Sequence, residues 1–475
     1  MLFPTITFAI FFMVVLVVNW LLIQQRTQWK LFMLAASYYF YGYFEWRFCL
    51  LIAVSTLFNQ LCARLIHRSD DDRLRRGILA LAVAGNLGLL GYFKYYGFFV
   101  SSATNLLDRI GIGISPEIVA ITLPIGISFF TFQALSYVID IYRRTFEPVS
   151  LLDFAVYESF FPHVVAGPIV RAAEFLPQLK ERHDPRRVDA SKAFFLIFIG
   201  LFKKVVIANF VATEIVDAVF GSPNQHSSLE VLVAIYAYAV QIYADFSGYT
   251  DMAIGLALLL GYRFPQNFDG PYTAVSLQDF WRRWHMTLSR WLRDYLYVPL
   301  GGNRGTSRAT YRNLMLTMVL GGLWHGAAWT FVAWGAIHGA FLSLEHWRRQ
   351  RREAKGLPEP DDTVWRRIGQ RVITFHIVCF AWVFFRAESF ENARDILGRL
   401  VWHWGEASPL VTTSVLVAVA FGIAMQYVPK DLLVRAMATF SRIPPVWQGV
   451  ALGFALLVTN TLGPRGVAPF IYFQF

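Results

Sequence analysis

Two histidines, His325 and His338, lie inside the apolar run GGLWHGAAWTFVAWGAIHG. An ionisable group within an apolar span is costly and tends to serve a function, and a neutral imidazole can act as a general base toward a hydroxyl. In an unbroken helix, His338 would lie about 220° around the axis from His325, so the two share a face only if the helix breaks. Gly321, Gly322 and Gly326 flank His325 and favour such a break, where the backbone can approach a substrate closely.

Both histidines also have a structural interpretation, as imidazoles hydrogen-bonded to a neighbouring helix. The residues alone leave both interpretations of His325 open. They favour the structural one for His338, which is nearer the basic loop that begins at Arg348. The chain contains no HxxxH or HExxH pair and no CxxC pattern, so we predict no metal site. It also lacks the GxSxG elbow typical of α/β serine hydrolases.

A second polar cluster is QIYADFSGYTDMA, in which Asp245 and Asp251 stand with Ser247 and Tyr249 in a long apolar segment. Buried carboxylates must be paired, hydrogen-bonded or neutral. One interpretation is a packing network in which Ser247 and Gly248 allow close helix contact. The other is an ion or proton relay, or the wall of a cavity, and the residues do not decide between them.

The stretch 276–302 mixes Trp and Arg too densely to cross lipid, and we expect short helices at the cytoplasmic interface. It contains His285, and its arginines Arg282, Arg283, Arg290 and Arg293 suit phosphate groups that arrive from the cytoplasm. Contact with anionic lipid head groups is the alternative. Segment 154–170 is apolar but broken by Pro and Gly, and such irregular backbone at membrane depth indicates an internal cavity.

The elements that must position these residues are membrane helices. Of the 475 residues, 56% are hydrophobic and 16% charged, well below the roughly 25% charged of soluble domains. The pattern predicts an all-α polytopic membrane protein of about 11–13 transmembrane or re-entrant helices. We expect spans near 5–24, 31–44, 48–66, 78–98, 117–140, 193–211, 229–260, 312–324, 326–345, 372–388, 409–428 and 446–462.

We predict one membrane domain over 1–475. Its parts are N-terminal spans in 1–150, a core with re-entrant segments in 151–345, a cytoplasmic loop in 346–371 and C-terminal spans in 372–475.

The net charge of +11 resides in short basic connections, such as 64–76 and 348–371, which alternate with poorly basic ones, such as 101–116. This is the positive-inside pattern rather than that of a nucleic-acid binder. It predicts a protein in contact with membrane lipid, with both termini outside the cytoplasm. The aromatic C-terminal PFIYFQF is then a candidate docking segment.

Five stretches resemble one known family. They are LPIGISFFTFQALSYVIDIYR, FFPHVVAGPIVR, YADFSGYTDMAIG, FWRRWHMTLSRWLRDYLYVPLGGNR and LGGLWHGAAWTFVAWGAIHG. In this order they are similar to the membrane-bound O-acyltransferases, and most of all to the bacterial polysaccharide branch that includes the alginate O-acetyltransferase membrane subunit. Together with the span order, the resemblance covers nearly the whole chain. Ala244, where an aromatic residue is expected, is one mild departure.

The resemblance implies transfer of an acetyl group from cytoplasmic acetyl-CoA, with no bound cofactor, through a central tunnel to a periplasmic acceptor hydroxyl. The transfer would serve O-acetylation of an exopolysaccharide, alginate-like or cellulose-like. The resemblance makes His325 the catalytic histidine and places His285 at the cytoplasmic mouth of the tunnel, and we predict that both are catalytic. The candidate acetyl-CoA-binding residues are Arg282, Arg283, Trp284, Arg293, Trp324 and Asn313, and the candidate tunnel or polar-network residues are Asp245, Ser247, Tyr249, Asp251, His338 and Arg171.

The resemblance further implies the inner membrane of a Gram-negative bacterium, with a periplasmic SGNH-type acetyltransferase and polysaccharide export or modification proteins as partners. D-alanyl and peptidoglycan acyltransferases share the histidine blocks and remain alternatives. Rivals of another class are a transporter or flippase, which would also have broken helices and midplane polar groups, and a non-catalytic export scaffold.

Overall fold

The computed structural model describes residues 1–113, 121–181, 183–358, 361–462 and 471. Throughout these residues the ordered elements are helices and no strand occurs, so the predicted all-α class is confirmed. Contacts divide the chain into two compact units. Unit 1 contains 1–190 and 256–265, and unit 2 contains 191–255 and 266–475. The predicted subdivision at 150, 345 and 371 remains a prediction.

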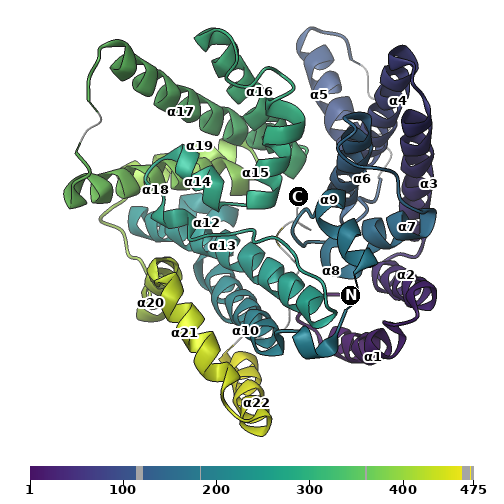
Figure 1. The fold of residues 1–475 in the computed structure, drawn as a ribbon. Coiled ribbons are helices and arrows are strands. Elements are labelled where there is room, and N and C mark those ends of the chain that lie inside the picture. The colour runs from purple at the N-terminus through teal and green to yellow at the C-terminus, as the bar shows by residue number, and fades with distance from the viewer. Residues whose placement is uncertain (114–120, 182, 359–360, 463–470, 472–475) are drawn as a thin grey trace. The chain divides into compact units, whose positions relative to one another are not determined.

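Unit 1 is built from helices that follow one another closely along the chain (Figure 1). A π-helical turn, η1 (Gly91–Tyr95), joins α4 (Asp72–Leu90) to α5 (Tyr96–Arg109), so that the two form one long element. The helices are α1 (Ile6–Leu22), α2 (Arg26–Gly42), α3 (Arg47–Arg68), α4 (Asp72–Leu90), α5 (Tyr96–Arg109), α6 (Ile127–Tyr142), α7 (Leu151–Ser159), α8 (Phe161–Val164) and α9 (Ala172–Phe175), with the 3-10 turns η2 (Leu176–Lys180) and η3 (Pro185–Arg187).

The predicted interruption of 154–170 is confirmed, because α7 ends at Ser159 and α8 is a single short turn. The polar groups buried there have partners. Glu158 accepts hydrogen bonds from Ser55 Oγ at 2.5 Å and Thr56 Oγ1 at 2.6 Å. The His163 ring is buried with Nε2 2.7 Å from the Tyr157 carbonyl oxygen, to which it donates. These hydrogen bonds lie within unit 1, whereas His163 Nδ1 has no hydrogen-bond partner among the described residues.

Unit 2 contains both histidines of the opening motif. Its helices are α10 (Ala190–Leu201, of which Ala190 belongs to unit 1), η4 (Phe202–Ala208), α11 (Asn209–Val211), η5 (Ala212–Val216), α12 (Asp217–Gly221), η6 (Pro223–Gln225), α13 (Ser228–Leu259, in this unit as far as Gly255), η7 (Pro271–Thr273), α14 (Leu277–Arg283), α15 (Met286–Leu292), η8 (Arg293–Tyr297), α16 (Ser307–His325), α17 (Trp329–Ala354), α18 (Val364–Arg386), α19 (Phe390–Trp402), α20 (Thr413–Ala424), η9 (Met425–Tyr427), α21 (Lys430–Ser441) and α22 (Pro445–Leu462).

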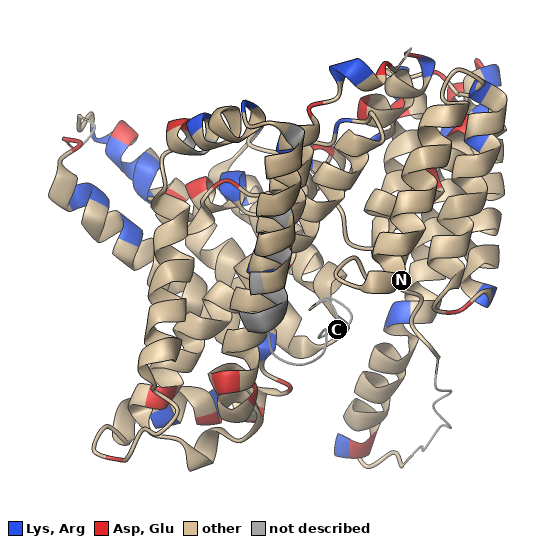
Figure 2. Ribbon diagram, turned by 90° about the horizontal axis from the view of Figure 1, so that it is seen from below, with Lys and Arg blue, Asp and Glu red and all other residues tan. Residues whose placement is uncertain are grey.

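Five helical segments among the described residues are long and apolar enough to cross a membrane, namely 47–68, 72–109, 190–221, 228–259 and 364–386. Shorter apolar helices cover 6–22, 127–142 and 413–427. The charged residues on the long helices of unit 1 lie mainly near the helix ends (Figure 2). Lys94, in the π-helical turn within 72–109, is an exception. The prediction of a polytopic helical membrane protein is confirmed. Helices α19 and α21 were not among the predicted spans.

The short helices predicted in 276–302 are also confirmed. Helices α14 and α15 have seven residues each, so each is about 10 Å long and cannot cross a hydrocarbon core of roughly 30 Å. They carry the Arg-rich motif between the long helices α13 and α16.

Candidate functional site

The predicted helix break occurs directly after His325. This residue is the last of α16, Gly326 is extended, and α17 begins at Trp329. The two helices form a hairpin that needs a glycine on α16, because a Cβ at Gly322 would lie 2.2 Å from the Phe331 carbonyl oxygen. The break therefore leaves His325 at the apex of a closely packed hairpin.

His325 is held among aromatic rings. Its side chain is only 3% exposed and meets the rings of Trp324, Trp334 and Phe385 edge-on, at centroid distances of 5.0, 5.1 and 5.2 Å. These rings come from α16, α17 and α18, so three helices fix the imidazole. An imidazole in its neutral form can accept a proton from a hydroxyl.

His285 also contacts Trp324. It is fully buried at the turn between α14 and α15, and its ring centroid is 6.0 Å from that of Trp324 and 4.6 Å from that of Phe246. Trp324 therefore contacts both histidines. The pair that we predicted from the motif resemblance is brought to one site, although 40 positions separate its members.

His338 takes a supporting position. It contacts the far side of the aromatic cluster through Trp334, at 4.8 Å between centroids, and its Nδ1 accepts a hydrogen bond from Trp281 Nε1 at 3.3 Å. It reaches His325 only through Trp334 in these contacts. This arrangement agrees with the structural interpretation of His338.

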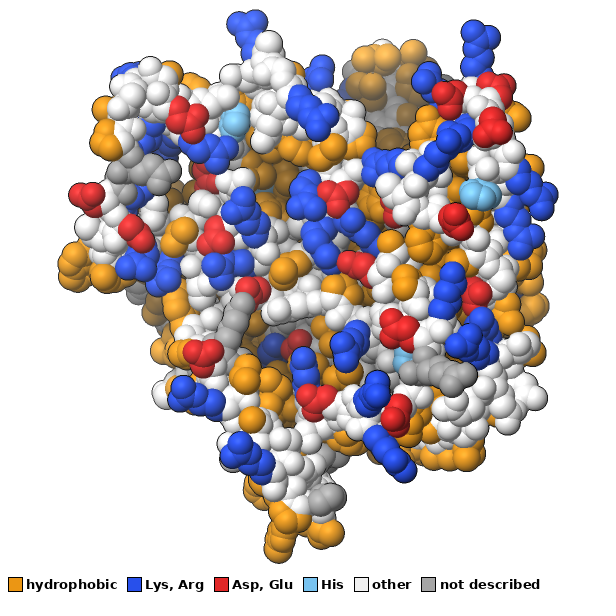
Figure 3. All heavy atoms as spheres, in the orientation of Figure 1, with side chains coloured by type: hydrophobic (Ala, Val, Ile, Leu, Met, Phe, Trp, Pro, Cys, Tyr) orange, Lys and Arg blue, Asp and Glu red, His pale blue; other side chains and the backbone are white. Residues whose placement is uncertain are grey.

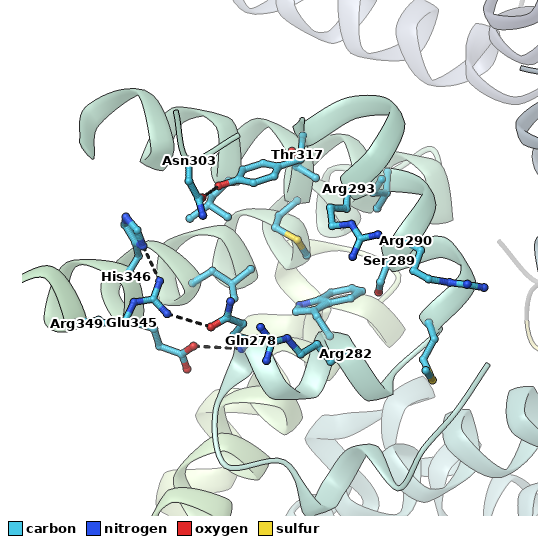
Figure 4. Close-up of a pocket in the computed structure, with 17 residues that line it drawn as sticks. Gln278, Arg282, Ser289, Arg290, Arg293, Asn303, Thr317, Glu345, His346 and Arg349 are labelled. Atoms are coloured by element: carbon cyan, nitrogen blue, oxygen red, sulfur yellow. Dashed lines mark hydrogen bonds between the residues drawn. The ribbon is translucent and has the colours of Figure 1, made fainter. Parts of the chain in front are cut away.

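A cavity of about 610 Å³ opens beside this cluster (Figure 4). It is lined by Met286, which follows His285, and by Met318 of α16, about two turns before His325. Its full lining is Gln278, Trp281, Arg282, Met286, Ser289, Arg290, Leu292, Arg293, Tyr297, Asn303, Leu314, Thr317, Met318, Leu342, Glu345, His346 and Arg349. The cavity is thus a basic chamber adjoining the buried histidines.

Four arginines from α14, α15, η8 and α17 line this chamber. Figure 4 shows Arg282, Arg290 and Arg293 on one side and Arg349 on the other, the last donating to Gln278 Oε1 at 3.3 Å. Figure 3 shows Lys and Arg side chains gathered around the position of α15. At the end of α17, partial burial and the Arg349 guanidinium lower the pKa of His346, so this imidazole adds little positive charge at neutral pH.

Four of the six candidate acetyl-CoA-binding residues do not line the cavity. One is Trp324, which contacts both histidines, and the other three have partners elsewhere. Arg283 forms an ion pair with Asp279 at 2.8 Å. Trp284 is fully buried, with its ring centroid 5.1 Å from that of Trp382. Asn313 donates to the Gly302 carbonyl oxygen at 3.1 Å. In the structure, these three residues have structural contacts. Their predicted contact with the acyl donor remains a prediction.

The carboxylates of the second polar cluster are paired with lysines that the sequence analysis did not single out. Lys204 Nζ lies 2.8 Å from Asp245 Oδ1, and Lys203 Nζ lies 2.7 Å from Asp251 Oδ2. The π-helix η4 carries both lysines, and its wider turn accompanies the pairing of two adjacent side chains with carboxylates on one helix, α13. Two adjacent lysines in an apolar segment could have predicted these ion pairs from the sequence.

The same region shows close helix packing, as one interpretation of this cluster required. A Cβ at Gly248 would lie 2.7 Å from the Gly200 carbonyl oxygen, and Ser247 and Tyr249 are buried beside it. Ile471, in the C-terminal segment expected to serve for docking, is buried, and its N–H donates to Asp245 Oδ2 at 2.8 Å. All residues of PFIYFQF other than Ile471 lie outside the described residues.

The remaining candidate, Arg171, belongs to unit 1, where it caps α9 with its backbone N–H donating to Glu174 Oε2 at 3.2 Å. Among the described residues, no three His, Cys, Asp or Glu side chains form a group that could hold a metal ion.

The sequence analysis also missed Asn267. Its Oδ1 lies 3.1 Å from His285 Nδ1, and it precedes the Arg-rich motif in an extended connection. An Asn in a polar connection gives no signal of its own in a single sequence.

Comparison with known proteins connects this geometry to a reaction class. The sequence model of the MBOAT, membrane-bound O-acyltransferase, family matches residues 38–385. A protein of Pseudomonas putida named probable alginate O-acetylase AlgI is 38% identical over 100% of both chains. The Azotobacter vinelandii protein of the same name is 37% identical over 94% of each chain. A peptidoglycan O-acetyltransferase of Helicobacter pylori is 37% identical over 78% of this chain and 73% of its own.

Proposed function

The chain belongs to the membrane-bound O-acyltransferase family, and on that premise we propose that it transfers an acetyl group from cytoplasmic acetyl-CoA to an acceptor hydroxyl for O-acetylation of an exopolysaccharide. The observation that carries the proposal is the meeting of His285 and His325 on Trp324, beside a chamber lined by arginines.

The acyl donor occupies the chamber in this proposal. Arg282 and Arg293 line it together with Arg290 and Arg349, and guanidinium groups bind phosphate through charge-assisted, often bidentate hydrogen bonds. The phosphates of CoA would then remain at the arginine-rich lining, while the thioester extends toward the buried histidines.

The transfer step needs a base. Neutral His325 accepts the proton of the acceptor hydroxyl as its oxygen forms a bond to the thioester carbonyl carbon. The carbon–sulfur bond then breaks, the leaving thiolate takes the proton from the imidazolium, and the products are an acetyl ester and free CoA. The aromatic enclosure of His325 supports this role because it excludes water that would otherwise compete as acceptor.

We place the protein in the inner membrane of a Gram-negative bacterium, with both termini on the periplasmic side and with membrane lipid around its apolar helices. A separate periplasmic SGNH-type acetyltransferase would receive the acetyl group and pass it to the polymer, together with polysaccharide export or modification proteins. The names of the Pseudomonas and Azotobacter relatives support an alginate-like polymer.

The test is transfer by the purified protein in nanodiscs, given radiolabelled acetyl-CoA and candidate acceptors. We expect CoA release that depends on an acceptor hydroxyl and loss of this release in His325→Gln. Uptake of intact labelled acetyl-CoA into proteoliposomes, without CoA release, would instead identify a transporter. Normal turnover by a correctly folded His325→Gln would refute the assignment of the base.

A second candidate acceptor is peptidoglycan, favoured by the identity of 37% to the Helicobacter protein. The chemistry at His325 would be the same. Supplying polysaccharide and peptidoglycan fragments in parallel, each with its periplasmic transferase, separates the two acceptors.

A further inference from the structure

Asn267 binds the turn that carries His285 through four hydrogen bonds. Its carbonyl oxygen accepts from the Met286 backbone N–H at 2.9 Å. Its side-chain Oδ1 accepts from Thr287 at both the backbone N, at 3.1 Å, and Oγ1, at 2.9 Å. The fourth contact joins the same Oδ1 to His285 Nδ1 at 3.1 Å.

These contacts fix the orientation of the Asn267 amide. A backbone N–H can only donate, so the amide atom that faces Thr287 N must be the oxygen. The same oxygen faces His285 Nδ1, and an amide oxygen can only accept. Nδ1 therefore carries the proton of a neutral imidazole, and the lone pair of the ring is on Nε2.

Nε2 of His285 is buried and has no hydrogen-bond partner among the described residues. The rings around it, those of Phe246, Phe268 and Trp324, carry no charge, and none of them forms a hydrogen bond with Nε2. A buried polar atom without a partner calls for an explanation, and an absent ligand is one.

The backbone conformation of His285 also indicates that this residue is held in place for a function. Its φ of +39° is in the left-handed region, which is unfavourable for a residue with a Cβ and is maintained only where the surroundings impose it. The bonds from Asn267 to Met286 and Thr287, directly after His285, impose it here.

We propose that Asn267 is a positioning residue that holds His285 in the Nδ1–H tautomer, so that Nε2 accepts a hydrogen bond from a donor group of the bound substrates. The group is an amide N–H of the acyl donor or the O–H of the acceptor. Neutral His285 then does not donate to the developing oxyanion. This inference deepens the proposed function and rests on it.

The first test is kinetic. Asn267→Ala removes the acceptor for Nδ1–H, and we expect kcat to fall about 100-fold because the wrong tautomer presents a donor where an acceptor is needed. Asn267→Asp keeps an acceptor oxygen and should retain activity within about tenfold of wild type. Thr287→Val is the matched control, because it removes one bond to the same oxygen but leaves the imidazole contact. We expect its kcat to stay within about threefold.

Equal losses in Asn267→Ala, Asn267→Asp and Thr287→Val, with normal folding, would mean that Asn267 only supports the turn and would overturn the proposal. The substrate that contacts Nε2 is distinguished by KM. In Asn267→Ala, a rise confined to acetyl-CoA identifies the acyl donor, and a rise confined to the acceptor identifies the hydroxyl.

The second test needs no turnover. In protein labelled with 15N-histidine, the His285 signals are assigned by their loss in His285→Gln. We expect Nδ1 to be protonated and Nε2 unprotonated in wild type, with this preference lost in Asn267→Ala. A protonated Nε2 in wild type would refute the tautomer. Because the spectrum is independent of acetyl transfer, failure of this proposal and failure of the proposed function give different results.

Discussion

Lys204 Nζ and Asp245 Oδ1 are 2.8 Å apart in the interior of unit 2, where the two side chains are 2% and 3% exposed. A buried pair of this kind adds little net stability over an apolar pair of similar shape, but the loss of one partner leaves an uncompensated charge.

Lys204→Met should therefore destabilise the protein by about 3–5 kcal/mol. Thermal unfolding in detergent, followed by tryptophan fluorescence, measures the change. Lys203→Met is the matched control, because its partner Asp251 is 21% exposed and can be hydrated, so a smaller loss is expected. The double variant Lys204→Met/Asp245→Asn should recover part of the stability, and a double variant no better than Lys204→Met would contradict an ion-pair origin.

Substitution of the two histidines of the opening motif should separate catalysis from structure. His325→Gln is expected to lower kcat by about 100- to 10,000-fold with little change in unfolding temperature, because it removes the base. His338→Gln should retain most activity, since His338 meets His325 only through Trp334. Comparable losses of kcat in both variants would argue against the separate roles.

The arginines of the chamber should govern affinity for the acyl donor. Arg282→Gln and Arg293→Gln are each expected to raise KM for acetyl-CoA about tenfold, equivalent to about 1.4 kcal/mol, and to weaken its salt dependence. Arg283→Gln is the comparison within the same motif. Arg283 is paired with Asp279 and does not line the chamber. The KM of Arg283→Gln for acetyl-CoA should therefore change less than twofold. Steady-state kinetics over a salt series would show whether Arg283 instead binds the donor.

The hairpin of α16 and α17 should tolerate no side chain at Gly322. Gly322→Ala places a methyl group 2.2 Å from the Phe331 carbonyl oxygen, so the helices must separate, and both stability and kcat should fall. Gly398→Ala on α19 has no atom within 4 Å of the added Cβ and should be neutral or stabilising by up to about 1 kcal/mol. Unchanged activity in Gly322→Ala would show that the hairpin geometry does not position His325.

Much of the fold was accessible from the sequence because its signals are local. Apolar length predicts membrane helices, and the glycines around His325 predicted a break that the structure places directly after it. The density of Trp and Arg in 276–302 likewise predicted short helices that do not span the membrane. The π-helical turn in 202–208 was not predicted, because wide turns follow from tertiary pairing rather than from residue propensity.

The candidate site was only partly accessible. The motif resemblance supplied His285 and His325. Three of the arginines that line the chamber, Arg282, Arg290 and Arg293, belong to the cluster in 276–302, and the fourth, Arg349, lies outside it. The sequence could not show that Arg282 lines the chamber while the adjacent Arg283 is paired with Asp279. Asn267 and Lys204 were missed because each acts on a partner distant along the chain, with no spacing rule that connects them.

The sequence by itself determined a helical membrane protein of the acyltransferase family, because apolar periodicity and the histidine motifs are written in consecutive residues. Only the tertiary structure decided which side chains hold these histidines. Hydrogen bonds and ring contacts act over a few ångströms in space, whatever the distance along the chain. They bring His285 and His325 into contact with the same ring, that of Trp324, and His338 into contact with Trp334. They also set the proton of His285 on the nitrogen that faces Asn267.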